Sequence, residues 1–248
     1  MPRFAANISW LFQEWPFLDR FAAAADAGFA AVECLFPYEV APDAIAQRLA
    51  RHNLKLVLFN VAPGDFAAGE RGIAAFPERR AELRDALAKG LDYARATGTP
   101  RLHLMAGIAQ GAAALASYRD CLRIACETAP DHDILIEPIN GHDIPGYLMN
   151  SFQLAAQLIG EMKLPNLKLQ FDIYHRRRMD GEVARGLAQL LSITGHVQVA
   201  SAPLRQEPGA AECEALRELD RLGYTGHVGC EYRPANGTLA GLGWMETV

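Results

Sequence analysis

Short apolar segments that end in a polar side chain recur through the second half of the chain at nearly even intervals. They cover residues 134–140, 167–172, 196–200 and 227–232, and they carry Glu137, Asp172, Gln198 and Glu231 at or near their ends. The segments are rich in β-favouring residues, as expected of buried strands. The four polar residues are 35, 26 and 33 positions apart, which is about the length of one strand plus one helix. The pattern therefore predicts a repeated strand–helix unit.

The first half of the chain continues this alternation. Strands are predicted at 4–8, 31–36, 54–60 and 101–105, and helices at 15–28, 42–53, 77–98 and 118–128. Later helices are predicted around 153–162, 183–190, 216–222 and 237–248. Eight units of about 31 residues fit an α/β fold of the (β/α)8 TIM barrel type. A doubly wound open sheet is the competing prediction, but no glycine-rich phosphate turn follows the first strand.

Two segments between these elements have no regular pattern. Residues 61–76 form a long predicted loop, and loops of this length in a compact domain are often functional. Within it, Glu70 and Arg71 are predicted to form a structural ion pair, with a lid latch as the alternative. Residues 176–178 are three consecutive arginines, which are predicted to lie in a solvated loop because they cannot all face one site.

Composition limits the domain organisation and the partners. The 248 residues are 50% hydrophobic, and no Pro/Gly/Ser-rich linker divides them, so a single domain covering residues 1–248 is expected. A net charge of −5 argues against a nucleic-acid partner. Five cysteines without CxxC spacing indicate reduced thiols and a cytoplasmic setting. No signal-peptide pattern or long apolar run is visible, so no membrane partner is expected.

The polar strand ends predict a metal centre. In a barrel the carboxyl ends of the strands meet at one mouth, which would bring Glu137, Asp172, Gln198 and Glu231 together. Such an all-oxygen set suits a divalent ion, with Mg²⁺ or Mn²⁺ favoured. Each carboxylate alone could instead be a surface residue or half of an ion pair. Four of them at matching positions on consecutive strands favour the metal.

A metal beside a bound carbonyl stabilises a developing enolate oxygen. Glu137 and Glu231, on opposite sides of a ligand, could then remove and return a proton, as in 1,2-proton transfer through a cis-enediol. Metal-assisted hydrolysis uses the same ligands and stays open. His175 is balanced between a structural and a ligand-binding role, and Arg205 between an exposed loop residue and a bidentate partner for a substrate carboxylate. His103 is predicted to be structural.

The chain also resembles the hydroxypyruvate isomerase family, within the xylose-isomerase-like barrel superfamily. The resemblance rests on motifs spread over nearly the whole chain: FAANIS at 4–9, VECLFPY at 32–38, GDFAAGERG at 64–72, IEPIN at 136–140, DIPGY at 143–147, DIYH at 172–175, EPG at 207–209 and GCEY at 229–232. The 64–72 and 172–175 motifs are the most specific of these.

The resemblance implies a metal-dependent enzyme that interconverts hydroxypyruvate and tartronate semialdehyde, or that acts on a related 2-oxo sugar acid such as 2-oxo-tetronate. By the family pattern, Glu137 and Glu231 are the proton-transfer pair and also bind the metal with Asp172 and Gln198. His175 and Arg205 contact the small 2-oxo or hydroxy acid. The resemblance is also compatible with a homo-oligomer, although no residue pattern indicates an interface.

Residues 200–212 depart from the family's glycine-rich loop, which makes the substrate the least determined part of the prediction. Two rival functions remain. One is an abasic-DNA endonuclease of the same superfamily, for which more histidines and a basic surface would be expected. The other is a non-catalytic sugar-acid binding protein on an inherited barrel.

Overall fold

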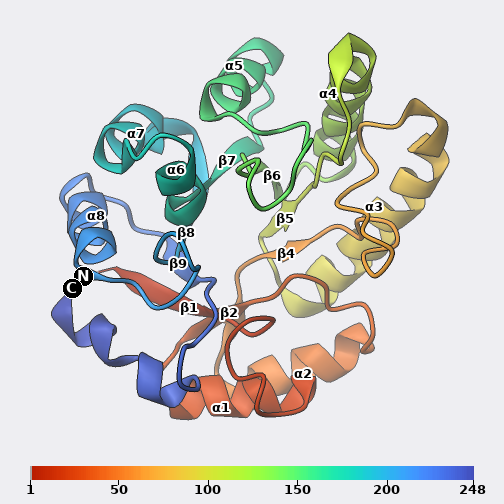
Figure 1. Cartoon of the computed structure of the whole chain (residues 1–248). Coiled ribbons are helices and arrows are strands. Elements are labelled where there is room, and N and C mark those ends of the chain that lie inside the picture. Colours follow the sequence, from red (N-terminus) through yellow and green to blue (C-terminus); the bar gives the residue numbers. More distant parts are fainter. Residues whose placement is uncertain (1) are drawn as a thin grey trace.

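Parallel strands form a ring in the computed structural model, which describes residues 2–248 (Figure 1). The strand order is β3-β2-β1-β9-β8-β7-β6-β5-β4, and every neighbouring pair in it is parallel. The strands are β1 Arg3–Asn7, β2 Ala31–Glu33, β3 Lys55–Leu56, β4 Phe59–Asn60, β5 Arg101–His103, β6 Asp133–Ile136, β7 Leu167–Asp172, β8 Thr194–Val199 and β9 His227–Cys230. The predicted (β/α)8 TIM barrel is confirmed.

The observed nine strands correspond to the predicted eight because one strand is interrupted. β3 and β4 both fall within the predicted strand 54–60 and stand at the two ends of the strand order. Val57 N, between them, donates to the Val32 carbonyl at 2.9 Å, and Asn60 N donates to the Leu35 carbonyl at 2.9 Å. The next residue, Val61, donates to the His103 carbonyl at 2.9 Å. This stretch therefore joins β2 to β5 and nearly closes the barrel.

Helices surround the strands (Figure 1). They are α1 Arg20–Asp26, α2 Pro42–His52, α3 Arg80–Thr97, α4 Gly111–Thr128, α5 Phe152–Met162, α6 Ile173–Met179, α7 Val183–Leu190 and α8 Ala210–Arg221, with short 3-10 helices η1 Phe17–Asp19, η2 Pro77–Arg79, η3 Leu191–Ile193, η4 Leu239–Gly241 and η5 Gly243–Thr247. Leu83, Leu87 and Leu91 of α3 are buried as one stripe on the barrel, as their spacing predicts. Among residues 2–248, no helix has the length and apolar character to cross a membrane.

Several helices differ from the prediction. α8 begins at Ala210 rather than near residue 216, and the helix predicted at 237–248 is replaced by the 3-10 helices η4 and η5. α4 begins at Gly111 rather than at residue 118, because the alanine-rich stretch 111–116 favours a helix without showing an apolar stripe. α6 follows β7 directly, where a loop was predicted, so the three arginines 176–178 are helical. Asp172 caps this helix by accepting the Tyr174 N–H at 2.8 Å, and Arg177 pairs with the buried Glu212 at 2.8 Å. The prediction of a solvated loop was wrong.

Candidate active site

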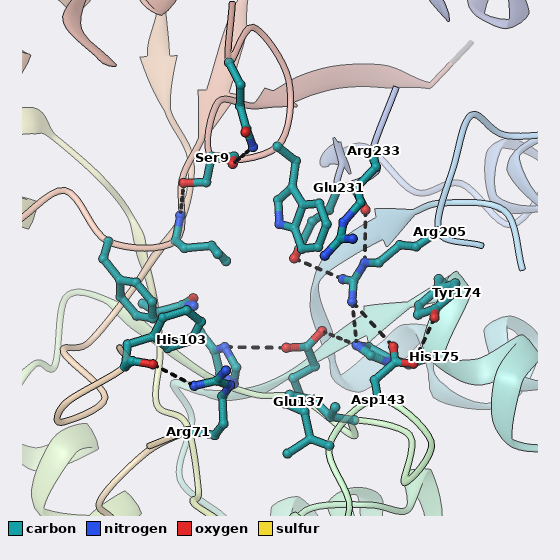
Figure 2. Close-up of a pocket in the computed structure, with 18 of the residues that line it drawn as sticks. Ser9, Arg71, His103, Glu137, Asp143, Tyr174, His175, Arg205, Glu231 and Arg233 are labelled. Carbon is teal, nitrogen blue, oxygen red and sulfur yellow. Dashed lines mark hydrogen bonds and ion pairs between the residues drawn. The ribbon is translucent and has the colours of Figure 1, made fainter. Parts of the chain in front are cut away.

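A cavity of about 930 Å³ lies at the carboxyl ends of the strands (Figure 2). Glu137 follows β6, which ends at Ile136 just before Pro138, and Glu231 follows β9. A proline has no N–H to donate, so the strand does not continue past this point. Glu137, Glu231, His175 and Arg205 all line this cavity. The topology thus brings together residues from distant parts of the sequence, at the end of the barrel where enzymes of this fold hold their sites.

Three of the candidate residues offer ligand atoms close together. A carboxylate oxygen of Glu137, one of Asp172 and a nitrogen of His175 lie within 4.8 Å of one another, and all three residues are buried. His175 Nε2 is 3.8 Å from Glu137 Oε1 and 3.6 Å from Asp172 Oδ2. The other ring nitrogen, Nδ1, lies 2.7 Å from Asn140 Nδ2, which orients the ring. The geometry therefore groups His175, predicted as a substrate contact, with two of the predicted metal ligands.

Gln198 lies in the layer beneath this group. Strand register pairs it with Asp172 on β7 and with Gly229 on β9. Its Nε2 donates to Glu33 Oε1 at 2.8 Å and to Glu231 Oε2, while its Oε1 accepts from Gln170 Nε2 at 2.7 Å. The amide oxygen therefore accepts one hydrogen bond in this arrangement and keeps a second lone pair that a metal ion could use.

Arg205 is the cation of the inner site. Its Nη2 lies 3.1 Å from Asp172 Oδ2 and 3.0 Å from Glu231 Oε1. The guanidinium carbon is 5.0 Å from the Trp10 ring centroid and 4.8 Å from that of Tyr174, within the range of cation–π attraction. Of the two open interpretations, an exposed loop arginine does not describe this residue, whose side chain is only 14% exposed. Its guanidinium group already forms ion pairs with two carboxylates of the protein, those of Asp172 and Glu231.

The inner site carries more negative charge than Arg205 can balance. Burial, followed by repulsion from Glu231 and Asp172, raises the pKa of Glu137 well above its ordinary value. Burial also raises the pKa of Asp172, although Arg205 opposes the shift. Burial likewise raises the pKa of Glu231 to about 8, and Arg205 again opposes the shift. Buried carboxylates that repel one another in this way are stabilised when a divalent cation is bound, so the residues present fit such an ion, and the imidazole of His175 suits Mn²⁺ better than Mg²⁺.

His103 is a buried side chain whose ring nitrogens are not hydrogen-bonded within the described residues. It lies at the end of β5 and lines the cavity, with Nδ1 3.6 Å from Glu137 Oε2. Neither ring nitrogen has a hydrogen-bond partner among the described residues, although both are buried. Burial lowers the pKa of His103 to about 3, which keeps the ring neutral. A buried polar group without a partner is costly, so this ring is placed to meet a bound ion or ligand.

Comparison with known proteins gives the site its context. The sequence profile of the xylose isomerase-like TIM barrel family matches residues 21–248. The chain belongs to this family. It is 46% identical to a 2-oxo-tetronate isomerase of Cupriavidus necator, over 99% of this chain and 98% of that protein. It is 41% identical to the hydroxypyruvate isomerase of Escherichia coli, over 99% of each chain. These relatives make the chain an enzyme of the isomerase class.

Solved structures agree on the barrel. A protein of Brucella melitensis described as an AP endonuclease of family 2 superposes with a TM-score of 0.96 and 43% identity, covering 100% of this chain and 99% of that one. The Escherichia coli 3-keto-D-glucoside 4-epimerase superposes with a TM-score of 0.81 at 18% identity, covering 100% of both chains. At that identity the second likeness shows the fold alone.

Two residues that line the cavity, His103 and Arg71, were not predicted from the sequence to belong to the site. His103 was predicted to be structural, yet it faces Glu137. Glu70 and Arg71 were predicted to pair with each other, but the carboxylate of Glu70 pairs with Arg79, and Arg71 lines the cavity. For His103 a signal was present, since it is a polar residue at a strand end, like the four residues that were selected. For Arg71 the only signal was its place in the 64–72 motif.

Proposed function

We propose that this isomerase interconverts hydroxypyruvate and tartronate semialdehyde, or the two corresponding isomers of a related 2-oxo sugar acid, by 1,2-proton transfer. The observation that carries the proposal is the pair of buried carboxylates, Glu137 and Glu231, that line one cavity beside Arg205. Burial raises the pKa of both carboxylates, to about 8 for Glu231, and a raised pKa suits a carboxyl group that returns a proton as well as accepting one. The names of the relatives support the same class of substrate.

The proposed reaction moves one proton between neighbouring carbons. One glutamate takes a proton from the hydroxymethyl carbon of hydroxypyruvate, and the C–H electrons form the double bond of an enediol. The carbonyl electrons move onto the carbonyl oxygen, which takes up the proton that the terminal hydroxyl gives up. The other glutamate returns a proton to the former carbonyl carbon, and the terminal carbon becomes the aldehyde. Substrate and product are isomers, so no oxidant or reductant is needed. Arg205, held against Glu231 and Asp172, favours the charged carboxylates between the two transfers.

A divalent metal forms part of the proposal. Glu137, Asp172 and His175 would hold it, with Glu231 and Gln198 as the further ligands that the family pattern implies. When bound, such an ion polarises the substrate carbonyl and lowers the pKa of the neighbouring C–H group. The side chains that line the cavity then orient the acid.

Exchange of substrate C–H with deuterium from solvent tests the proton-transfer roles. With Mg²⁺ or Mn²⁺ and a panel of small hydroxy-oxo acids, NMR should show exchange with the wild-type protein. Glu137→Gln and Glu231→Gln should each slow it by about 10²- to 10⁴-fold, the usual contribution of a positioned acid or base. Glu127→Gln, on the exposed side of α4, is the matched control. Exchange that persists undiminished in both site variants contradicts the assigned roles.

The four-carbon acid is the second candidate substrate. Identity to the 2-oxo-tetronate isomerase of Cupriavidus necator is 46%, against 41% to the hydroxypyruvate isomerase. Both acids carry a carboxylate next to the exchanging carbon pair, so the same residues serve either. Comparing kcat/KM for the two acids decides between them.

Abasic DNA is the remaining alternative, because one solved relative is described as an AP endonuclease. A net charge of −5 and an inner site dominated by carboxylates both oppose a polyanionic ligand. Cleavage of an abasic duplex at a rate comparable to sugar-acid turnover would favour the nuclease instead.

A further inference from the structure

Arg71 stands on the side of the cavity away from Arg205. It belongs to the loop 61–76, between β4 and η2, and it lines the cavity with His103 and Glu137. In the view of Figure 2, Arg71 and Arg205 lie on opposite sides, and the Glu137 carboxylate lies between them. The proton-transfer scheme above does not use Arg71.

The positive charge of Arg71 has no carboxylate partner among residues 2–248. Its Nη1 donates to the carbonyls of Phe66 at 3.0 Å and Glu70 at 2.7 Å. The nearby carboxylate of Glu70 binds Arg79 instead, and also accepts the backbone N–H of Asp65. No bond to the described residues is made by Nε or Nη2 of Arg71. A half-buried guanidinium with two free donor groups is suited to a planar anion.

The loop holds this guanidinium in a defined place. Its carbon lies 3.9 Å from the Phe66 ring centroid, and Phe66 in turn contacts Phe36 edge-on at 5.0 Å. Gly72, the next residue, has φ +113° and packs so closely on the Met105 backbone that a Cβ would overlap its carbonyl. The donor groups of Arg71 are therefore ordered before a ligand arrives, which lowers the entropic cost of binding.

Arg205 is differently placed for an anion. Its Nη2 already contacts Asp172 and Glu231, and its Nη1 lies 4.0 Å from Asp143. A substrate carboxylate brought against that guanidinium would meet the repulsion of these acids. No carboxylate of the described residues forms an ion pair with Arg71, because the neighbouring Glu70 is paired with Arg79.

We propose that Arg71 is the receptor for the carboxylate of the substrate and that it selects short acids over neutral sugars. The acid would span the cavity with its carboxylate on Arg71 and its exchanging carbons beside Glu137 and Glu231. This inference rests on the proposed function for the identity of the reacting carbons. The carboxylate site itself is independent of turnover.

Arg71→Met tests the proposal with paired ligands. Kinetics compare the acid that the wild type turns over with its neutral analogue, in which CH2OH replaces the carboxylate: dihydroxyacetone for hydroxypyruvate, or erythrulose for 2-oxo-tetronate. Calorimetry compares glycerate, an acid that lacks the oxo group, with glycerol. Arg71→Lys keeps the charge but not the fork, and Arg84→Met, exposed on α3, controls for the loss of one positive charge.

We expect Arg71→Met to raise KM for the acid and the dissociation constant of glycerate by roughly 10- to 100-fold, as expected for a hydrogen bond to a charged group. Constants for the neutral analogue should change by less than about twofold, Arg71→Lys should be intermediate, and Arg84→Met should match the wild type. Equal losses on acid and neutral analogue, or unchanged glycerate binding in Arg71→Met, would overturn the proposal. If the wild type binds glycerate through Arg71 but turns over no acid, the proposed function alone is overturned. If the wild type does not bind glycerate, the proposed role of Arg71 is overturned.

Discussion

Gly229→Ala is a sharp test of the layer beneath the site. Gly229 lies on β9 against the carboxylate of Glu33, and a methyl group there would overlap the three terminal atoms of that carboxylate. Glu33 is fully buried and accepts from Asn7 Nδ2 at 3.0 Å and Gln198 Nε2 at 2.8 Å, with His196 Nε2 at 2.6 Å. The alanine can fit only if the carboxylate leaves these partners.

The expected cost follows from those contacts. Overpacking a filled interior costs about 1–3 kcal/mol, and separating a buried charge from its partners costs about 3–5 kcal/mol. Because the carboxylate can shift and keep some of its bonds, we expect the free energy of unfolding to fall by about 3 kcal/mol. For a chain of this size, about 2–4 °C of Tm is lost per kcal/mol, so Tm should drop by roughly 6–12 °C.

Thermal and urea unfolding, followed by circular dichroism, measure the effect. Gly160→Ala, in an exposed position of α5 with no atom within 4 Å of the added Cβ, is the control and should stabilise by up to about 1 kcal/mol. Glu33→Asp shortens the crowded side chain, so the double variant Gly229→Ala/Glu33→Asp should lose less than the sum of the single losses. A Gly229→Ala protein as stable as the control, or strictly additive losses, would refute this reasoning.

Two further predictions concern the inner site. Dialysis against EDTA should abolish turnover, and Mg²⁺ or Mn²⁺ should restore it. At 100 times its Kd the metal should also increase the free energy of unfolding by about 2.7 kcal/mol, seen as a higher Tm. Full activity in protein shown by elemental analysis to be metal-free would contradict this. Because the pKa of Glu231 rises from 4.5 to about 8 in the folded state, the folded protein binds more protons than the unfolded chain in that interval, so the metal-free protein should lose stability as pH rises through it. Glu231→Gln should flatten that decline, and an equally steep pH profile in the variant would exclude Glu231 as its cause.

The barrel was predictable because its strands carry their own signals. β6, β7, β8 and β9 are short apolar runs with a polar residue near the end, and this pattern depends only on local sequence. Parallel strands in a barrel all end at the same mouth, so the proximity of Glu137 and Glu231 followed from the fold. Their place in one cavity needed no knowledge of the loops.

The parts that escaped prediction depend on contacts between distant segments. The helix α6 is seven residues long and is fixed by the Asp172 cap, so no apolar period marked it. The pairing of Arg205 with Asp172 and Glu231 links positions 33 and 26 residues apart. Glu70 forms its ion pair with Arg79 rather than with Arg71, and this depends on where η2, which carries Arg79, lies beside the loop. Sequence separation alone does not report such pairings.

Charge balance links the proposed metal to the proposed carboxylate receptor. Glu137, Asp172 and Glu231 would together carry three negative charges when ionised, and Arg205 supplies one positive charge among them. A divalent ion would neutralise the remaining two, so the inner site would have no net positive charge to attract an anionic substrate. The carboxylate of the acid then needs a separate cation at some distance from these acids. Arg71 and Arg233 both line the cavity without a carboxylate partner in the described chain. Arg233 lies against Trp10, the ring that Arg205 also faces, whereas Arg71 is ordered by Phe66 on the opposite side, and so Arg71 meets that requirement.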